Sequence, residues 1–203
     1  MPPATEAGTN VEASSMLLRP EILLLPTIPE PLHTINPRNV LGSGWWNKER
    51  KRCYESTNHS CIACGVHKSK ALYRKHVEAH EVYDTNYEAG ELTYIETVPL
   101  CNACHSFVHL GRLKWLLDTQ QISFARYTAV IKRGNAQLAL IGKTLKDKPM
   151  GNEDLVDWFE WRLVVFGMRF DCDGRHVNKS ITGDRKDVLQ SRYGNNRRRS
   201  VSR

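Results

Sequence analysis

Four stretches of the chain carry apolar residues three or four positions apart, the spacing of a helix with one buried face. The clearest stretch runs from Cys104 to Gln121, where the stripe consists of Phe107, Leu110, Leu113, Leu116 and Leu117. The stretch that begins at Asp154 also fits a change from helix to strand around residues 163–170. The predicted helices therefore cover residues 44–57, 104–121, 123–142 and 154–165.

Two further stretches, residues 71–83 and 92–98, have the composition of β-strands. The segment between them contains Asn86 and Gly90, which are residues that favour turns. We therefore expect a β-hairpin in the middle of the chain. The second strand leads directly to a cysteine pair and then to the helix that begins near Cys104.

The two ends of the chain lack periodic apolar positions. Residues 1–20 are small and polar, which predicts disorder. Five prolines between residues 20 and 37 argue against a helix there and predict an extended arm on the surface. From residue 181 onward seven basic and two acidic residues give a local charge of +5. We expect this tail to be disordered as well.

Composition places the chain among soluble globular proteins, with 40% hydrophobic and 25% charged residues. Its longest apolar runs are far shorter than the roughly 20 residues that span a bilayer. The first fifteen residues lack the order of a signal peptide, so we expect a cytoplasmic protein without a membrane partner. The net charge of +7 favours nucleic acid as a partner, although a solvated surface would carry the same charge.

Two C-x-x-C pairs, Cys61 with Cys64 and Cys101 with Cys104, are the main chemical signal in the sequence. Four thiolates in two such pairs are typical of a structural Zn²⁺ site, and the absence of an export signal argues against disulfides. The 36 residues between the pairs predict a folded insertion. Cys53 is expected in the core, and Cys172 has no assignment.

Histidines accompany both pairs. His105 directly follows Cys104, and His109 lies four residues further on, so both rings should lie on one face of the same helix. His80 and Glu81 lie on the first strand of the hairpin, where successive side chains alternate between the two faces.

Residues 61–111, with VEAHEVYD, VPLCNACH and His109, resemble the zinc-knuckle HNH endonucleases. The resemblance implies an α+β fold with a zinc-stabilised ββα-metal core, flanking helices and disordered termini. It implies that His80, His105 and His109 hold a catalytic divalent ion, Mg²⁺ or Mn²⁺, with zinc or nickel as alternatives. The implied substrate is DNA, and the implied reaction is hydrolysis of a phosphodiester bond, as a nick or a double-strand cut.

The chain departs from the family pattern at two positions. The family's second histidine, the general base, is replaced by Glu81, and its middle asparagine falls near Glu96. Either Glu81 is the base and His80 a metal ligand, or His80 itself is the base. If the site has decayed, the alternative function is a non-catalytic zinc module that binds nucleic acid or protein.

The expected organisation has four regions. Residues 1–37 form the proline-rich arm, 38–120 the zinc-knuckle HNH-like domain, 121–182 a helical extension and 183–203 the basic tail. Six basic residues flank the expected site and could hold neighbouring phosphates, although a solvated basic face is the plain alternative. They are Lys68, Lys70, Arg74, Lys75, Arg112 and Lys114.

Overall fold

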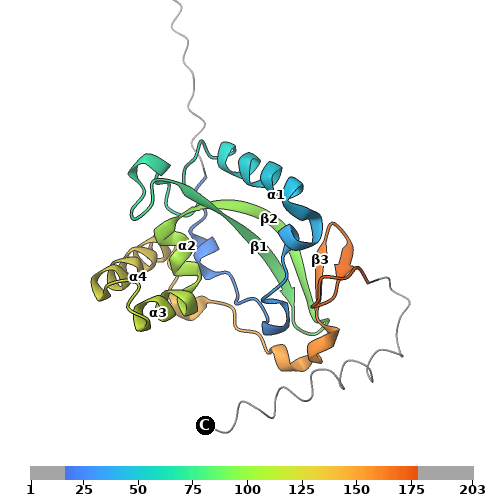
Figure 1. Ribbon diagram of the computed structural model, residues 1–203. Helices are drawn as coiled ribbons and strands as arrows, with labels where there is room; N and C mark the ends of the chain where they lie inside the picture. Colours follow the sequence, from blue (N-terminus) through green and yellow to red (C-terminus); the bar gives the residue numbers. More distant parts are fainter. Residues whose placement is uncertain (1–16, 178–203) are drawn as a thin grey trace, which may run out of the picture. The chain divides into compact units, whose positions relative to one another are not determined.

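A computed structural model of the protein describes residues 17–177. They form an α+β fold with four α-helices and one four-stranded sheet, drawn in Figure 1. The predicted disorder of residues 1–16 and of the basic tail falls outside the described residues. Among those described, no helix is both long and apolar enough to cross a membrane.

The described chain divides into two compact units, each assembled from separated segments. The first unit contains residues 17–27, 43–83 and 95–151, and the second contains residues 28–42, 84–94 and 152–177. The two hairpin strands contribute residues to both units.

The predicted hairpin is confirmed, with strand β1 at Val77–Asn86 and strand β2 at Glu91–Cys101. Strand β1 begins six residues later than predicted and ends three residues later, whereas β2 begins one residue earlier and ends three residues later. The last five residues of β2, from Thr97 to Cys101, are buried without alternation. A strand that is buried on both faces delivers Cys101 directly into the core of the first unit.

Three helices complete the core of the first unit: α2 at Asn102–Val108, α3 at Leu110–Asp118 and α4 at Phe124–Ala139. The Ser123 side chain caps α4 by accepting a hydrogen bond from the Arg126 backbone N–H at 3.2 Å. Helix α2 packs closely on α4, because Gly134 has no side chain and the Phe107 ring occupies the space that a Cβ there would fill.

Two of the predicted helices are interrupted in the structure. The continuous helix expected over residues 104–121 breaks at His109, whose φ of −96° and ψ of 58° are not helical. Helix α1, Pro37–Glu55, begins earlier than predicted but is interrupted at Gly42, with a φ of 83° that favours glycine. Its part in the first unit buries Cys53, as expected.

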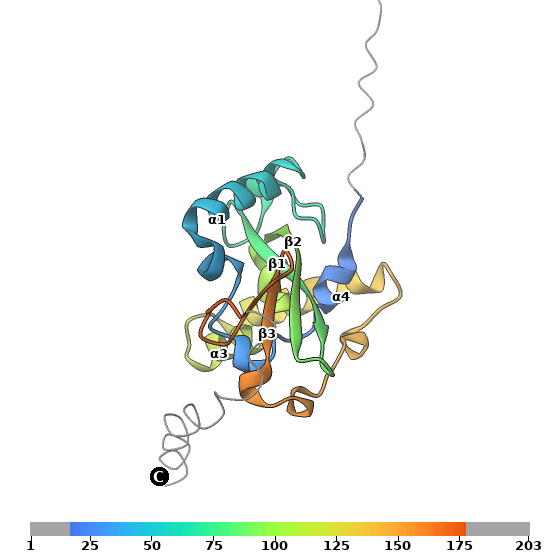
Figure 2. The same cartoon turned by 90° about the vertical axis from the view of Figure 1, so that its right-hand side faces the viewer.

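The second unit contains the short strands β3, Arg162–Val165, and β4, Met168–Phe170. Strand β3 pairs in parallel with the start of β2, from Glu91 to Thr93, as Figure 2 shows. Strands β3 and β4 form a tight antiparallel hairpin. Its two loop residues, Phe166 and Gly167, both have positive φ, as such turns require.

The helix predicted over residues 154–165 is wrong. The chain makes two short 3₁₀ turns, Glu153–Leu155 and Trp158–Glu160, and then enters β3. The alternative of a strand near residue 163 is the better description. Trp161, Leu163 and Val165 are completely buried, so the run belongs to the interior of a sheet and not to one face of a helix.

The proline-rich arm is not an extended surface segment. Its described part forms 3₁₀ helices at Pro20–Leu24 and Glu30–Leu32, where proline in the first turn is tolerated. Ile22 and Leu23 are buried in the core of the first unit beside α2 and α4. The prolines therefore do not exclude short 3₁₀ helices, and the apolar residues between them make this segment part of the core.

Candidate metal centres

The four cysteines of the two C-x-x-C pairs converge in the first unit, with all sulfur atoms within 4.8 Å of one another. Three of them, Cys61, Cys101 and Cys104, are almost completely buried. The sulfur atoms of Cys64 and Cys101 are 3.8 Å apart. A tetrahedron with metal–sulfur bonds of about 2.3 Å has edges of about 3.8 Å. The cluster therefore has the composition and the spacing of a site for an ion such as zinc.

The first pair lies on a tight turn. The Gly65 N–H donates to the Cys61 carbonyl at 2.8 Å, and the Cys61 N–H donates to the Val66 carbonyl at 2.9 Å. Gly65 has a φ of 71°, which explains the glycine after the second cysteine. These bonds turn both thiols of the pair to one side of the chain.

The second pair lies where β2 ends and α2 begins. Cys101 is the last residue of the strand, and Cys104 belongs to the first turn of the helix. The two pairs are joined by a hydrogen bond from the Ile62 N–H to the Pro99 carbonyl at 2.9 Å. A metal ion at the cysteines would therefore fix the start of α2 relative to both strands.

A positive charge from α4 lies beside the cysteines. Arg133 directs a guanidinium N–H at the Cys64 sulfur, 3.6 Å away. Hydrogen bonds from the neighbouring thiols, above all that of Cys101, hold the pKa of Cys64 well below its usual range. The positive charge of Arg133 beside the cluster favours the thiolate, the form that binds metal.

The three histidines of the sequence analysis also converge. Their nearest ring nitrogens lie within 4.8 Å of one another, with His80 on β1 and with His105 and His109 around α2. The ring centres are 4.8 to 5.2 Å apart. His109 joins the cluster although it ends α2, so its ring is placed by the break between α2 and α3 and not by continuous helical spacing.

Two of these histidines are neutral near pH 7. Burial, followed by the charges of His105 and His109, holds the pKa of His80 well below its usual range. Burial and the nearby charges of His105, Arg112 and Lys148 lower the pKa of His109 to about 4. A neutral imidazole has a free lone pair and is the form that coordinates a metal.

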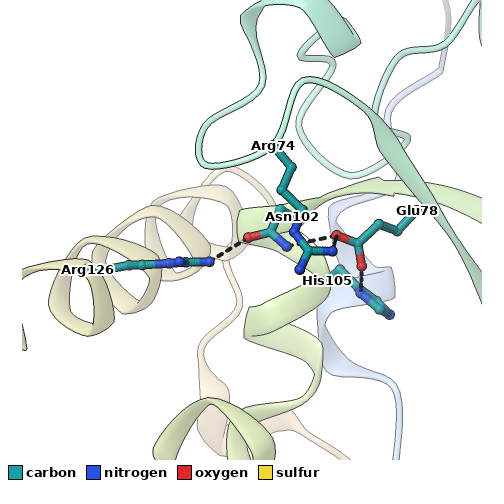
Figure 3. Close-up of polar contacts among 5 residues, drawn as sticks. All are labelled: Arg74, Glu78, Asn102, His105 and Arg126. Atoms are coloured by element: carbon teal, nitrogen blue, oxygen red, sulfur yellow. Dashed lines mark hydrogen bonds and ion pairs between the residues drawn. The ribbon is translucent and has the colours of Figure 1, made fainter. Parts of the chain in front are cut away.

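The Glu78 carboxylate lies beside the His105 ring, as Figure 3 shows. The His105 Nδ1–H donates to one Glu78 carboxylate oxygen at 2.7 Å, and the Asn102 side-chain amide donates to the other at 2.7 Å. Asn102 in turn accepts from the Arg126 guanidinium at 3.0 Å. The hydrogen bond from His105 is the main cause that lowers the pKa of Glu78 to about 2, so this carboxylate is ionised.

The sequence analysis missed Glu78 and Asn102. Strand alternation was a usable signal, because Glu78 lies two residues before His80 and must share its face. Asn102 lies inside the second C-x-x-C pair, where no spacing rule distinguishes it from the other residues between the cysteines. It is buried, and it lies six residues beyond the position at which the family pattern suggested an asparagine.

The structure does not bring Glu81 to the three histidines. Its neighbour His80 is buried, and alternation places Glu81 on the opposite face of β1. The pKa of the buried Cys53 thiol of α1 is raised to about 12 by burial and then by carboxylates that include Glu49 and Glu81. Glu96 is likewise engaged elsewhere, because its carboxylate accepts from the Arg19 guanidinium at 2.7 Å.

Two of the six expected phosphate-binding residues lie next to the histidine cluster. Arg74 is 3.9 Å from the Glu78 carboxylate, and the charge of Arg112 acts on His109. Lys114 instead pairs with Asp118 on its own helix at 2.6 Å. Lys148 was not expected, but its half-buried ammonium acts on His109, and burial lowers its own pKa.

Comparison with known proteins gives no relative: no family model matches the chain, and neither a curated protein nor a solved structure is significantly similar to it.

Proposed function

We propose that the protein is a metal-dependent endonuclease that hydrolyses phosphodiester bonds of DNA. The observation that carries the proposal is the convergence of His80, His105 and His109 beside a separate cluster of four cysteines. In this proposal zinc at the cysteines is structural, and β1, β2 and α2 form a ββα-metal core of the HNH type. The three histidines then hold a second ion, which leaves part of its coordination shell for substrate.

The donor set bears on which ion the second site would take. All three side chains offer imidazole nitrogen, and no carboxylate belongs to the group within the described residues. Imidazole suits ions such as Ni²⁺ and Zn²⁺, whereas Mn²⁺ and above all Mg²⁺ prefer oxygen ligands. We therefore favour Mn²⁺ over Mg²⁺ among the two ions expected from the resemblance, with nickel and zinc as further candidates.

When bound, such an ion would polarise a phosphate oxygen and stabilise the leaving 3′ oxygen. The protein's own residues supply metal ligands and positive charge. His80 acts as a ligand and not as the general base, because an imidazole with so low a pKa is a poor proton acceptor. Glu81 takes no part at the metal, since it lies on the other face of β1. Arg112 and Lys148 beside His109 supply positive charge for the phosphate.

DNA is the substrate class that fits the surroundings of this site. From Gly65 to Val77 the chain carries four lysine or arginine residues and two histidines but no acidic residue. This segment connects the first cysteine pair to the strand that bears His80, so it brings positive charge to the edge of the site. Contacts of this kind supply affinity through phosphate neutralisation and little sequence preference.

The test is a nicking assay on supercoiled plasmid with zinc-loaded protein, with and without added Mn²⁺, Ni²⁺ or Mg²⁺. We expect Mn²⁺ or Ni²⁺ to support cleavage and EDTA to abolish it. His105→Ala should lose cleavage while keeping its zinc, whereas His33→Ala, an exposed histidine of the second unit, should keep both. Wild-type protein that cuts neither DNA nor RNA with any of these ions would refute the proposal.

One observation favours the alternative of a non-catalytic zinc module. Of the two positions at which the sequence departs from the family pattern, Glu81 lies on the face of β1 opposite His80, and Glu96 accepts a hydrogen bond from Arg19. If the protein binds DNA with the salt dependence of phosphate contacts but never cleaves it, this alternative replaces the first. The three histidines would then serve binding or folding alone.

A further inference from the structure

A chain of four side chains connects α4, the start of α2 and β1 to the histidine cluster. It runs from Arg126 to Asn102, from Asn102 to Glu78 and from Glu78 to His105, with heavy-atom distances of 3.0, 2.7 and 2.7 Å. Figure 3 shows that the residues lie in one row, with Arg74 alongside Glu78. The row is thus built from three elements that are far apart in the sequence.

The two residues in the middle of this row, Asn102 and Glu78, each make a side-chain hydrogen bond to the residue on either side. Each carboxylate oxygen of Glu78 accepts from a different donor, and the Asn102 amide uses its nitrogen toward Glu78 and its oxygen toward Arg126. Asn102 is buried, and Glu78 and His105 are each largely enclosed. An asparagine held from both sides has one orientation, so it fixes the Glu78 carboxylate in direction as well as in place.

The consequence for His105 is a defined tautomer. A carboxylate can only accept, so Nδ1 carries the proton that it donates to Glu78, which leaves Nε2 as the nitrogen that can bind a metal ion. Nε2 is therefore the nitrogen that His105 can offer to the cluster with His80 and His109. A carboxylate behind a histidine also makes that histidine a more basic ligand.

We propose that Glu78 is the positioning residue of the histidine site, and that Asn102 ties it to the cysteine site. Asn102 lies between Cys101 and Cys104 in sequence, so the turn of α2 that holds the first ion also holds the residue that orients Glu78. This inference rests on the proposed function, because it assumes that the three histidines bind a metal ion. It adds Glu78 and Asn102 as the residues that orient the ring of one of these histidines, His105.

The experiment measures Co²⁺ binding to zinc-loaded protein by calorimetry and by visible absorption. Co²⁺ at the histidines gives ligand-field bands without the thiolate-to-cobalt charge-transfer band that exchange at the cysteines would produce. We expect Glu78→Gln to weaken Co²⁺ binding about 10- to 100-fold, the usual effect of losing such a partner. Glu81→Gln, a carboxylate of the same strand on the other face, should leave Co²⁺ affinity unchanged.

Glu78→Asp separates positioning from folding. It retains the negative charge but retracts the carboxylate by one methylene, so its Co²⁺ affinity should fall between those of the wild type and Glu78→Gln. Equal Co²⁺ affinity and spectra in the wild type, Glu78→Gln and Glu78→Asp would overturn the positioning role alone. Wild-type protein that binds no Co²⁺ beyond its zinc would overturn this role together with the proposed histidine site. If Glu78→Gln fails to fold, wild-type affinity in Glu78→Asp counts against the role, and weakened affinity supports it.

Discussion

At the scale of single residues, the two candidate centres differ in what their loss should cost. The cysteine cluster lies in the core, and structural zinc of this kind contributes on the order of 10 kcal/mol to folding. The histidine cluster lies beside that core, and the His105 ring is held by a hydrogen bond to Glu78 that does not need an ion. Substitution of a cysteine of the cluster should therefore unfold the protein. Substitution of one of the three histidines should remove only the function of that site and leave the fold intact.

The first prediction concerns the cysteines. Cys104→Ser should give protein that contains no stoichiometric zinc and lacks a cooperative unfolding transition. Cys172→Ser, which changes a cysteine outside the cluster, should keep about one zinc per chain and a wild-type transition. Elemental analysis and thermal denaturation test both. Folded wild-type protein without zinc would contradict the proposed role of the cluster.

The second prediction concerns Lys148, whose charge lies near His109 although it is far from it in sequence. If it helps to hold a phosphate, Lys148→Met should weaken DNA binding or slow cleavage about 10-fold or more, because a partly buried contact to an ionic group is worth roughly 1.5–3 kcal/mol. Lys146→Met, an exposed neighbour, is the matched control. Equal behaviour of the two variants in binding and cleavage assays would remove Lys148 from the site.

At the scale of elements, the contact between α2 and α4 decides where the candidate ligands stand. Gly134 allows the two helices to approach until the Phe107 ring fills the place of a side chain. Phe107 follows His105 by two residues, so a displaced α2 would carry His105 and Cys104 with it. The packing of a single ring therefore has an effect on both centres.

The third prediction follows from that contact. Gly134→Ala should destabilise the protein by about 1–3 kcal/mol, because an added methyl overlaps the Phe107 ring. Gly111→Ala on α3 meets no atom within 4 Å and should be neutral or stabilising by up to about 1 kcal/mol, since alanine favours helix. Chemical denaturation of both variants tests the pair. A neutral Gly134→Ala would mean that Phe107 can move aside freely.

Elements of the first unit were more predictable than those of the second. The C-x-x-C spacing, the turn at Asn86 and the apolar spacing of α4 are local signals, and the structure confirms the hairpin and that helix. The run from Trp158 to Val165 has no such signal. Its apolar residues fit a helix equally well until parallel pairing with the distant β2 makes them a strand.

The candidate site was predictable as a set of residues but not as a geometry. Cys104, His105 and His109 stand out by type and spacing. The break that places the His109 ring, and the hydrogen bonds that join Glu78 to Asn102, depend on tertiary packing that no short motif records. Alternation along a regular strand did predict that Glu81 and His80 lie on opposite faces of β1. The resemblance alone left open which of the two residues faces the site.

At the scale of the whole molecule, charge is concentrated in sequence. Residues 189–203 contribute five arginines and no acidic residue to a chain of net charge +7. The fourth prediction is that truncation after Val188 weakens DNA binding and reduces its dependence on salt, since the slope scales with the number of phosphates neutralised. Binding isotherms at several salt concentrations test it. An identical slope in both proteins would show that the tail does not contact DNA.

The first turn of α2 places a severe limit on how this gene can change in length. Within five consecutive residues, from Cys101 to His105, the chain supplies two sulfur ligands, the amide that orients Glu78 and one imidazole. One inserted or deleted residue there would rotate every following side chain by about 100° around the helix axis and disconnect both centres at once. The turn between β1 and β2 contributes no residue to either centre. Natural variants that differ in length should therefore differ in that turn and not in CNACH.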